Sequence, residues 1–156
     1  MTSVSTTVSS GRVGGVDYGT VRIGLALSDP ERKIASPLEV YARRNAELDA
    51  RFFQRLAQDE HIALWVVGLP IHLDGRESPK SNEARRFGKW LEEVTLLPVV
   101  FFDERFSSRQ AEEILQAAEL TRKRRKKRID MLAAQIMLTA YLESQGRGEK
   151  EPAPID

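Results

Sequence analysis

VDYGTVRIGLALSD, residues 16–29, decides the fold, because it contains the turn between two predicted strands. Apolar residues dominate 13–17 and 21–28, and Tyr18 and Gly19 supply a tight turn between these two segments. Residues 37–41 are typical of a third strand, so we expect the chain to open with a three-stranded antiparallel meander. An acidic residue, Asp17, ends the first of these strands.

The rest of the chain alternates between helical and extended patterns. Apolar residues at helical spacing indicate helices with one buried face, and short continuous apolar runs are typical of strands buried on both faces. The elements expected after the meander are a helix over 46–59, a strand over 62–67, a helix over 82–94, a strand over 98–103, a helix opening at Ser107 and a helix over 129–141. This order predicts an α/β fold with a mixed sheet, antiparallel then parallel, flanked by helices.

Length and composition fit one soluble globular domain. The chain has 156 residues, of which 41% are hydrophobic and 30% charged. We expect a folded domain over 11–143 between disordered tails at 1–10 and 144–156. No apolar run is long enough to cross a bilayer, and the first ten residues lack the features of a secretory signal, so we expect a cytoplasmic protein. No cysteine and only two histidines leave no zinc site of the usual kind.

The net charge of +1 hides an uneven distribution of charge. RKRRKKR at 122–128 contains seven of the 24 lysines and arginines without an acidic residue, so the remainder of the chain is net negative. Such a focused positive patch most often binds a polyphosphate, and its place next to Asp130 favours nucleic acid. The alternative is a solvated basic loop.

Three acidic residues stand where predicted strands end or where a predicted helix begins: Asp17, Glu104 and Asp130. Carboxylates brought together in this way can hold divalent metal ions against a phosphodiester backbone. Each has a simpler explanation when taken singly. Asp17 could stabilise a turn, Glu104 could pair with Arg105, and Asp130 could be a favourable charge in the first turn of a helix. One shared site explains all three together.

Four blocks of the sequence resemble the signatures of one protein family, and they occur in the family's order. They are VDYGTVRIGLALSD (16–29), VVGLPIHLDG (66–75), FFDERFSS (101–108) and RIDMLAAQIMLTAYL (128–142). The chain resembles the YqgF family, also called RuvX or Holliday-junction-resolvase-like proteins, over residues 12 to 143. The element order, with an acid in the first strand, is that of the ribonuclease H-like fold.

This resemblance implies a metal-dependent nuclease. Asp17, Glu104 and Asp130 would match the family's catalytic aspartate, glutamate and last-helix aspartate, and the three would hold two Mg²⁺ or Mn²⁺ ions about 4 Å apart. Alternation along a strand places Asp103 and Glu104 on opposite faces, so at most one of them should face the metal ions. The resemblance implies that this one is Glu104, and Asp103 is expected either to support the site from behind it or to orient Arg105. Ser107 and Ser108 stand where the family often has threonines, and we expect them to be supporting residues or helix caps rather than nucleophiles.

Basic residues are expected to bind the phosphates of the substrate. They are Arg22, Arg105, Arg122, Lys123, Arg124, Arg125, Lys126, Lys127 and Arg128. The family's usual assignment is processing of the 5′ end of the 16S ribosomal RNA precursor, which we favour over cleavage of four-way DNA junctions. A resolvase of such junctions should be a dimer, whereas the sequence suggests a monomer or weak dimer.

Two rival functions come from other classes. The Asp-Tyr-Gly-Thr string at 17–20 also resembles the phosphate loop of sugar kinases and actin-like ATPases, but those proteins clamp nucleotide between two lobes and this chain is long enough for only one. The second rival is a catalytically silent protein that keeps the fold and binds nucleic acid without cutting it.

Overall fold

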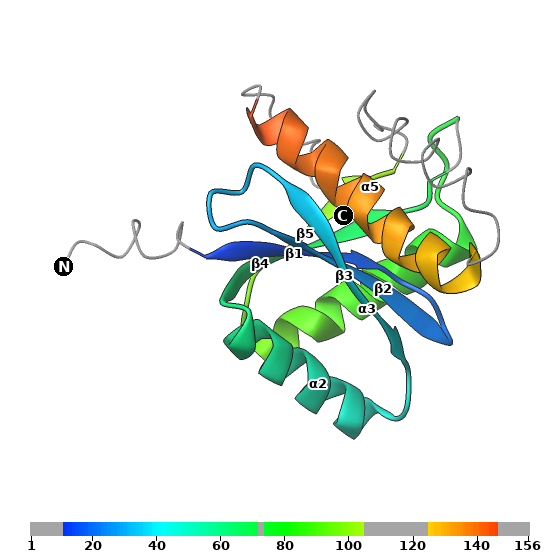
Figure 1. The fold of residues 1–156 in the computed structure, drawn as a ribbon. Coiled ribbons are helices and arrows are strands. Elements are labelled where there is room, and N and C mark those ends of the chain that lie inside the picture. The colour runs from blue at the N-terminus through cyan, green and yellow to red at the C-terminus, as the bar shows by residue number, and fades with distance from the viewer. Residues whose placement is uncertain (1–10, 72–73, 105–124, 147–156) are drawn as a thin grey trace.

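A computed structural model describes residues 11–71, 74–104 and 125–146, with the side chains of 125–131 outside the description. It contains a five-stranded mixed sheet whose strand order is β3-β2-β1-β4-β5 (Figure 1). β1 pairs antiparallel with β2, and β2 with β3, whereas β1, β4 and β5 run parallel. The elements in chain order are β1 (Arg12–Asp17), β2 (Arg22–Ser28), β3 (Ala35–Ala42), α2 (Ala46–Asp59), β4 (Ile62–Leu69), α3 (Pro79–Thr95), β5 (Val99–Asp103) and α5 (Arg125–Gly146). The expected meander and the parallel strands that follow it are confirmed.

Side-chain caps fix where α2 and α3 begin. The Asn45 side chain accepts a hydrogen bond from the Leu48 backbone amide, so α2 starts at the next residue and spans the predicted range. Ser78 caps α3 in a reciprocal capping box with Ser81, and Pro79 occupies the first helical position. Ser78 and Pro79 are the residues whose types predict a cap and a first helical position, and this prediction is confirmed, although the expected range of 82–94 starts three residues late.

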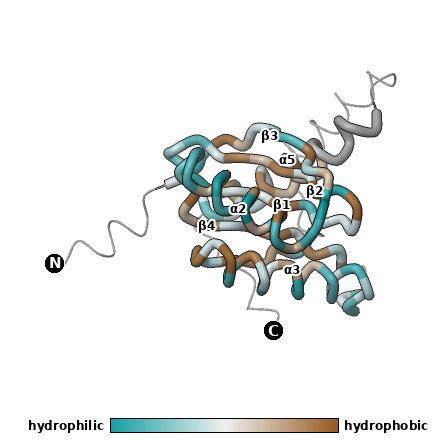
Figure 2. The backbone as a smooth tube through the Cα atoms, turned by 90° about the horizontal axis from the view of Figure 1, so that it is seen from below, coloured by the Kyte–Doolittle hydropathy of each residue, from teal (hydrophilic) through white to brown (hydrophobic). Residues whose placement is uncertain are grey.

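Helices cover both faces of the sheet, and each face has its own hydrophobic core. α2 and α3 lie on one side of the sheet and α5 on the other (Figure 1). Phe53, Trp65 and Leu91 are fully buried between the sheet and the α2–α3 layer. Val66 and Leu138 are fully buried on the side of α5. In Figure 2, α3 alternates between hydrophobic and hydrophilic residues, as expected for a helix with one buried face.

The last helix differs from its expected form. α5 begins at Arg125, inside the basic run, rather than at Ile129, and it continues to Gly146. Its fully buried residues include Ala134 and Leu138, whereas Ile136, which the apolar spacing over 129–141 predicts to lie on the inner face, is only half-buried. The physical reason lies in β1, where a Cβ atom on Gly15 would come within 3.0 Å of the Leu138 Cβ. The bare glycine backbone thus lets Leu138 pack directly on the sheet.

Some sequence expectations fall on residues that the structure does not describe. They are the tail at 1–10, the part of the C-terminal tail beyond residue 146, the helix opening at Ser107 and residues 122–124 of the basic run. Within the described part of the chain, no helix combines the length and the apolar character that a membrane crossing requires.

Candidate active site

The carboxyl-terminal ends of the parallel strands bring two of the predicted acids together. Asp17 is the last residue of β1, and Glu104 follows β5 directly, with its backbone amide donating to the Leu69 carbonyl at 3.1 Å. Val13 and Phe102 pack in the core beneath α5. Because side chains alternate along a strand, Asp17 and Glu104 lie on that same face of the sheet.

A cavity of about 400 Å³ lies at this edge of the sheet. Its walls come from the ends of β1 and β4, the β1–β2 turn and the first turns of α3. The lining residues are Asp17, Tyr18, Gly19, Thr20, Val21, Arg22, Gly68, Pro70, Lys80, Glu83, Ala84 and Glu104. The position agrees with the general rule that ligands of sheets with parallel strands bind outside the carboxyl ends of those strands.

Gly68 makes room for the Glu104 carboxylate. It lies in β4, between the strands that carry Asp17 and Glu104, and it is paired with Phe102 of β5. A Cβ atom at this position would come within 2.5 Å of Glu104 Oε2 and 3.1 Å of Met137 Cγ. The missing side chain therefore creates the space in which the carboxylate sits between the sheet and α5. The sequence pattern places Gly68 directly after the strand predicted over 62–67 and contains no sign of this role.

The surroundings of Glu104 disfavour its negative charge. The side chain as a whole is exposed, but its carboxylate lies against Gly68. Loss of hydration there, followed by repulsion from Asp17 and Asp103, raises the pKa of Glu104 to about 7. Two carboxylates that repel each other in one cavity are an arrangement that a bound cation would relieve.

The donor set fits a hard divalent cation in part. Asp17 and Glu104 offer the carboxylate oxygens that Mg²⁺ and Mn²⁺ prefer. Among the side chains that the structure describes, no group of three or more metal-binding residues gathers at one point. A third carboxylate would have to come from a side chain outside that set, and Asp130 is such a residue.

Asp130 belongs to α5, the helix that passes over Gly68. Met137 of this helix would contact a Cβ atom at Gly68, and Asp130 precedes Met137 by seven residues. Seven residues are two helical turns, so the two positions share a face of the helix and are about 10 Å apart along its axis.

The other residues predicted to belong to the site lie in the cavity, on the opposite face of the sheet, or in segments that the structure does not describe. Arg22 is exposed and lines the cavity. Asp103 is 1% exposed, and alternation directs it to the opposite face from Glu104. Arg105, Ser107, Ser108, Arg122, Lys123 and Arg124 lie outside the described residues, and Arg125, Lys126, Lys127 and Arg128 form the start of α5 without described side chains.

Two structural features hold the β1–β2 turn in place. A Cβ atom on Gly19 would collide with the Arg22 carbonyl oxygen, so the turn closes tightly and keeps Arg22 beside the cavity. Arg43 donates to the Tyr18 hydroxyl at 3.1 Å, lies over its ring with 5.5 Å to the centroid, and pairs with the buried Asp49 at 3.3 Å. Sequence reasoning missed this support, since its members are far apart in the chain.

The α3 side of the cavity was also missed. Lys80 and Glu83 line it, one from the first turn of the helix and the other from the second. The available signal was the loop after β4, because a loop at the carboxyl end of a parallel strand lies where ligands bind.

The chain is similar to proteins of one family along nearly its whole length. A profile of the family described as "RuvX: Holliday junction resolvase" matches residues 11–144. A Rhodopirellula baltica protein named "Putative pre-16S rRNA nuclease" is 51% identical over 142 residues, covering 90% of this chain and 82% of that protein. A Koribacter versatilis protein with the same name is 39% identical over 142 residues, covering 91% and 93%.

Solved structures of resolvases share the fold. Thermus thermophilus RuvC, solved in complex with a Holliday junction substrate, superposes with a TM-score of 0.55 at 16% identity and covers 91% of this chain and 99% of its own. The fowlpox virus resolvase in complex with Holliday junction DNA gives 0.53 at 12% identity and covers 86% and 98%. The ribonuclease H-like fold expected from the order of the elements is confirmed.

Proposed function

Because the chain belongs to the RuvX family, we propose that it is a nuclease that hydrolyses phosphodiester bonds with the help of divalent metal ions. The observation that carries the proposal is the convergence of Asp17 and Glu104 on one cavity at the carboxyl edge of the sheet. Neither a turn nor a surface ion pair requires these two acids to meet. A shared ligand does.

The chain's own residues would hold the metal and place the substrate. Asp17, Glu104 and Asp130 would bind Mg²⁺ or Mn²⁺, and a bound pair of these ions would supply the activation of a water molecule and the stabilisation of the leaving oxygen. Gly68 keeps the space for the Glu104 carboxylate. Arg22 would contact a phosphate of the bound strand from the rim of the cavity.

We propose the precursor of 16S ribosomal RNA as the substrate. Support comes from the relatives, which are up to 51% identical and are named as nucleases of this RNA. The resolvases that share the fold are less than 20% identical, so they support the architecture and leave the substrate open. This substrate implies action in the cytoplasm.

We also propose that the protein acts as a monomer or weak dimer. In the described part of the chain the exposed large hydrophobic side chains are Val21, Ile34 and Leu96, each from a different loop or turn. Scattered single residues of this kind do not form the contiguous apolar patch that a stable dimer interface needs.

The test is cleavage by purified protein. A transcript carrying the 5′ leader of 16S RNA and a four-way DNA junction would be incubated with Mg²⁺ or Mn²⁺, and with EDTA. We expect metal-dependent cleavage of the transcript that is lost in Asp17→Asn, Glu104→Gln and Asp130→Asn. The matched control is Glu92→Gln, an exposed acid of α3 outside the cavity, which should cleave normally.

Three other results would change the assignment. Preferential cleavage of the junction would favour the resolvase function. Binding of RNA without products at any metal concentration would favour a catalytically silent binding protein. Full activity in Asp17→Asn would show that the cavity is not where the reaction occurs.

A further inference from the structure

The α3 wall of the cavity carries a lysine that the proposed nuclease reaction does not yet use. Lys80 is exposed at the second position of α3 and lines the same cavity as Asp17 and Glu104. Its ammonium group makes no ion pair or hydrogen bond with any residue that the structure describes. An exposed lysine is usually a solvated surface charge, as Lys89 on the same helix is. Lys80 differs because it faces a cavity.

The charge of the cavity makes Lys80 suited to an anionic ligand. Among the residues that the structure describes, three acids, Asp17, Glu83 and Glu104, line the cavity beside two basic residues, Arg22 and Lys80. A phosphodiester that approaches the carboxylates meets repulsion, which must be offset by cations on the walls. A lysine ammonium is a compact point charge and a common ligand of phosphate oxygens.

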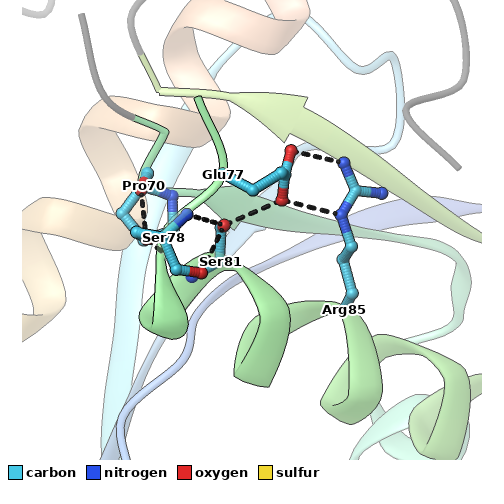
Figure 3. A network of polar contacts seen from close by, with 5 residues as sticks. All are labelled: Pro70, Glu77, Ser78, Ser81 and Arg85. Carbon is cyan, nitrogen blue, oxygen red and sulfur yellow. Dashed lines mark hydrogen bonds and ion pairs between the residues drawn. The ribbon is translucent and has the colours of Figure 1, made fainter. Parts of the chain in front are cut away.

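The turn that carries Lys80 is held rigidly by a polar network (Figure 3). Arg85 donates two hydrogen bonds to the Glu77 carboxylate, from Nε at 3.1 Å and from Nη2 at 3.0 Å. The Ser81 hydroxyl donates to the same carboxylate at 2.8 Å. Because of the hydrogen bonds from Arg85 and Ser81, the pKa of Glu77 is lowered, so the carboxylate is ionised. The network thus joins Glu77, two residues before α3, to the first and second turns of the helix.

The same network reaches Pro70, which directly follows the strand that carries Gly68. The Ser78 hydroxyl donates to the Pro70 carbonyl at 3.0 Å, and Pro70 itself lines the cavity (Figure 3). Ser78 and Ser81 are both buried and close the capping box around Lys80. The backbone on both sides of Lys80 is therefore fixed relative to the end of β4.

We propose that Lys80 binds a phosphate of the substrate strand next to the scissile one, and that Glu77 is the positioning residue that fixes the turn carrying Lys80. The inference rests on the proposed nuclease function, because it takes the cavity to be where the strand enters. It adds a second phosphate subsite on the α3 side of the cavity, separate from the one at Arg22.

Binding to a non-cleaving protein separates this inference from catalysis. All variants would be made in the Asp17→Asn background and titrated with a short fluorescein-labelled single-stranded RNA in EDTA, over a range of salt concentrations. For Lys80→Ala we expect affinity to fall about fivefold to tenfold and the slope of log affinity against log salt to become shallower by about 0.7 to 1, the value for one phosphate contact. Lys80→Arg should keep most of the affinity. Lys89→Ala should change neither quantity by a comparable amount.

The Glu77 variant tests positioning. Glu77→Gln should weaken binding in the same direction, and its effect should largely disappear when Lys80 is already alanine, since both changes act on one contact. Additive effects, together with a lower unfolding temperature, would show that Glu77 only stabilises the fold and would overturn its positioning role. Unchanged affinity and salt slope in Lys80→Ala would overturn the phosphate subsite. If Lys80→Ala weakens binding while the wild-type protein cuts nothing, the subsite stands and the nuclease proposal fails.

Discussion

Substituting alanine for Gly68 tests whether the position of the Glu104 carboxylate matters. The added Cβ atom would lie 2.5 Å from Glu104 Oε2, whereas ordinary van der Waals contact starts at 3.4 Å. The carboxylate must therefore move by about 1 Å. A displacement of this size in a group that positions the reacting atoms can lower the rate about 100-fold.

The cost in stability should be small by comparison. The atom in closest contact is the end of a flexible side chain, and the next, Met137 Cγ at 3.1 Å, must give by a few tenths of an ångström. Alanine also restricts the unfolded chain, which stabilises the fold by about 0.4 to 1 kcal/mol where the backbone tolerates it. We expect a net change in the free energy of unfolding within about 1 kcal/mol.

Gly14 provides a control in which an added Cβ atom should lower stability without affecting the Glu104 carboxylate. A Cβ atom on Gly14 would lie 2.7 Å from the ring of Trp65, which is fully buried in the core beneath α2 and α3 and cannot swing away. Gly14→Ala should lower the free energy of unfolding by about 1 to 3 kcal/mol through overpacking and leave the activity per folded molecule unchanged.

Single-turnover cleavage and urea denaturation of both variants would be measured side by side. Normal activity in a folded Gly68→Ala protein would refute the reasoning, because the carboxylate would then be free to sit elsewhere. An equal loss of stability in Gly68→Ala and Gly14→Ala would also contradict the reasoning, because it would mean that the Glu104 carboxylate does not move away from the added Cβ atom.

Three further substitutions have defined outcomes. The raised pKa of Glu104, about 7 against a usual 4.5, means that its ionised form opposes folding without metal. In EDTA at pH 8, Glu104→Gln should therefore be more stable than wild type in urea by about 1 kcal/mol, a figure discounted for exposure, and this gain should vanish below about pH 4.5. Asp49→Asn weakens the buried ion pair with Arg43 and should lower the free energy of unfolding by about 2 to 3 kcal/mol. Burial and then Asp49 raise the pKa of Tyr41 to about 12, so an ultraviolet titration of this variant should show a lower pKa for Tyr41. Ser78→Ala removes the cap of α3 and should cost about 1 to 2 kcal/mol in thermal denaturation.

Local signals were sufficient for most of the elements. The helix over 46–59 was predicted with its observed bounds, because its apolar spacing is a signal contained within the segment itself. The start of α5 was predicted four residues late. Arginine and lysine are good helix formers, so a run of positive charge does not by itself delay a helix.

The buried face of α5 could not be derived from the helix alone. Its rotation depends on Gly15, a residue of β1 that lets Leu138 approach the sheet. A pattern within one helix contains no information about which residue of the partner surface lacks a side chain.

The candidate site shows the same division. Asp17 and Glu104 could be predicted, because acids at the ends of parallel strands must lie at one edge of the sheet. Gly68 could not, because its role depends on its register between two other strands. For Lys80 the only signal was its place at the end of the polar loop after β4, and its contribution to the cavity depends on how α3 packs on the face of the sheet opposite to α5.

The most direct test of the central claim is a titration of the metal-free protein with Mn²⁺, in which electron paramagnetic resonance measures the concentration of free ion and so gives the affinity. If Asp17, Glu104 and Asp130 share one metal site, neutralising any of the three as the amide should weaken Mn²⁺ binding at least about tenfold, while Glu92→Gln binds like the wild type. Wild-type affinity in both Asp17→Asn and Glu104→Gln would contradict the account, because the cavity that the two carboxylates share would then have no part in holding the ion.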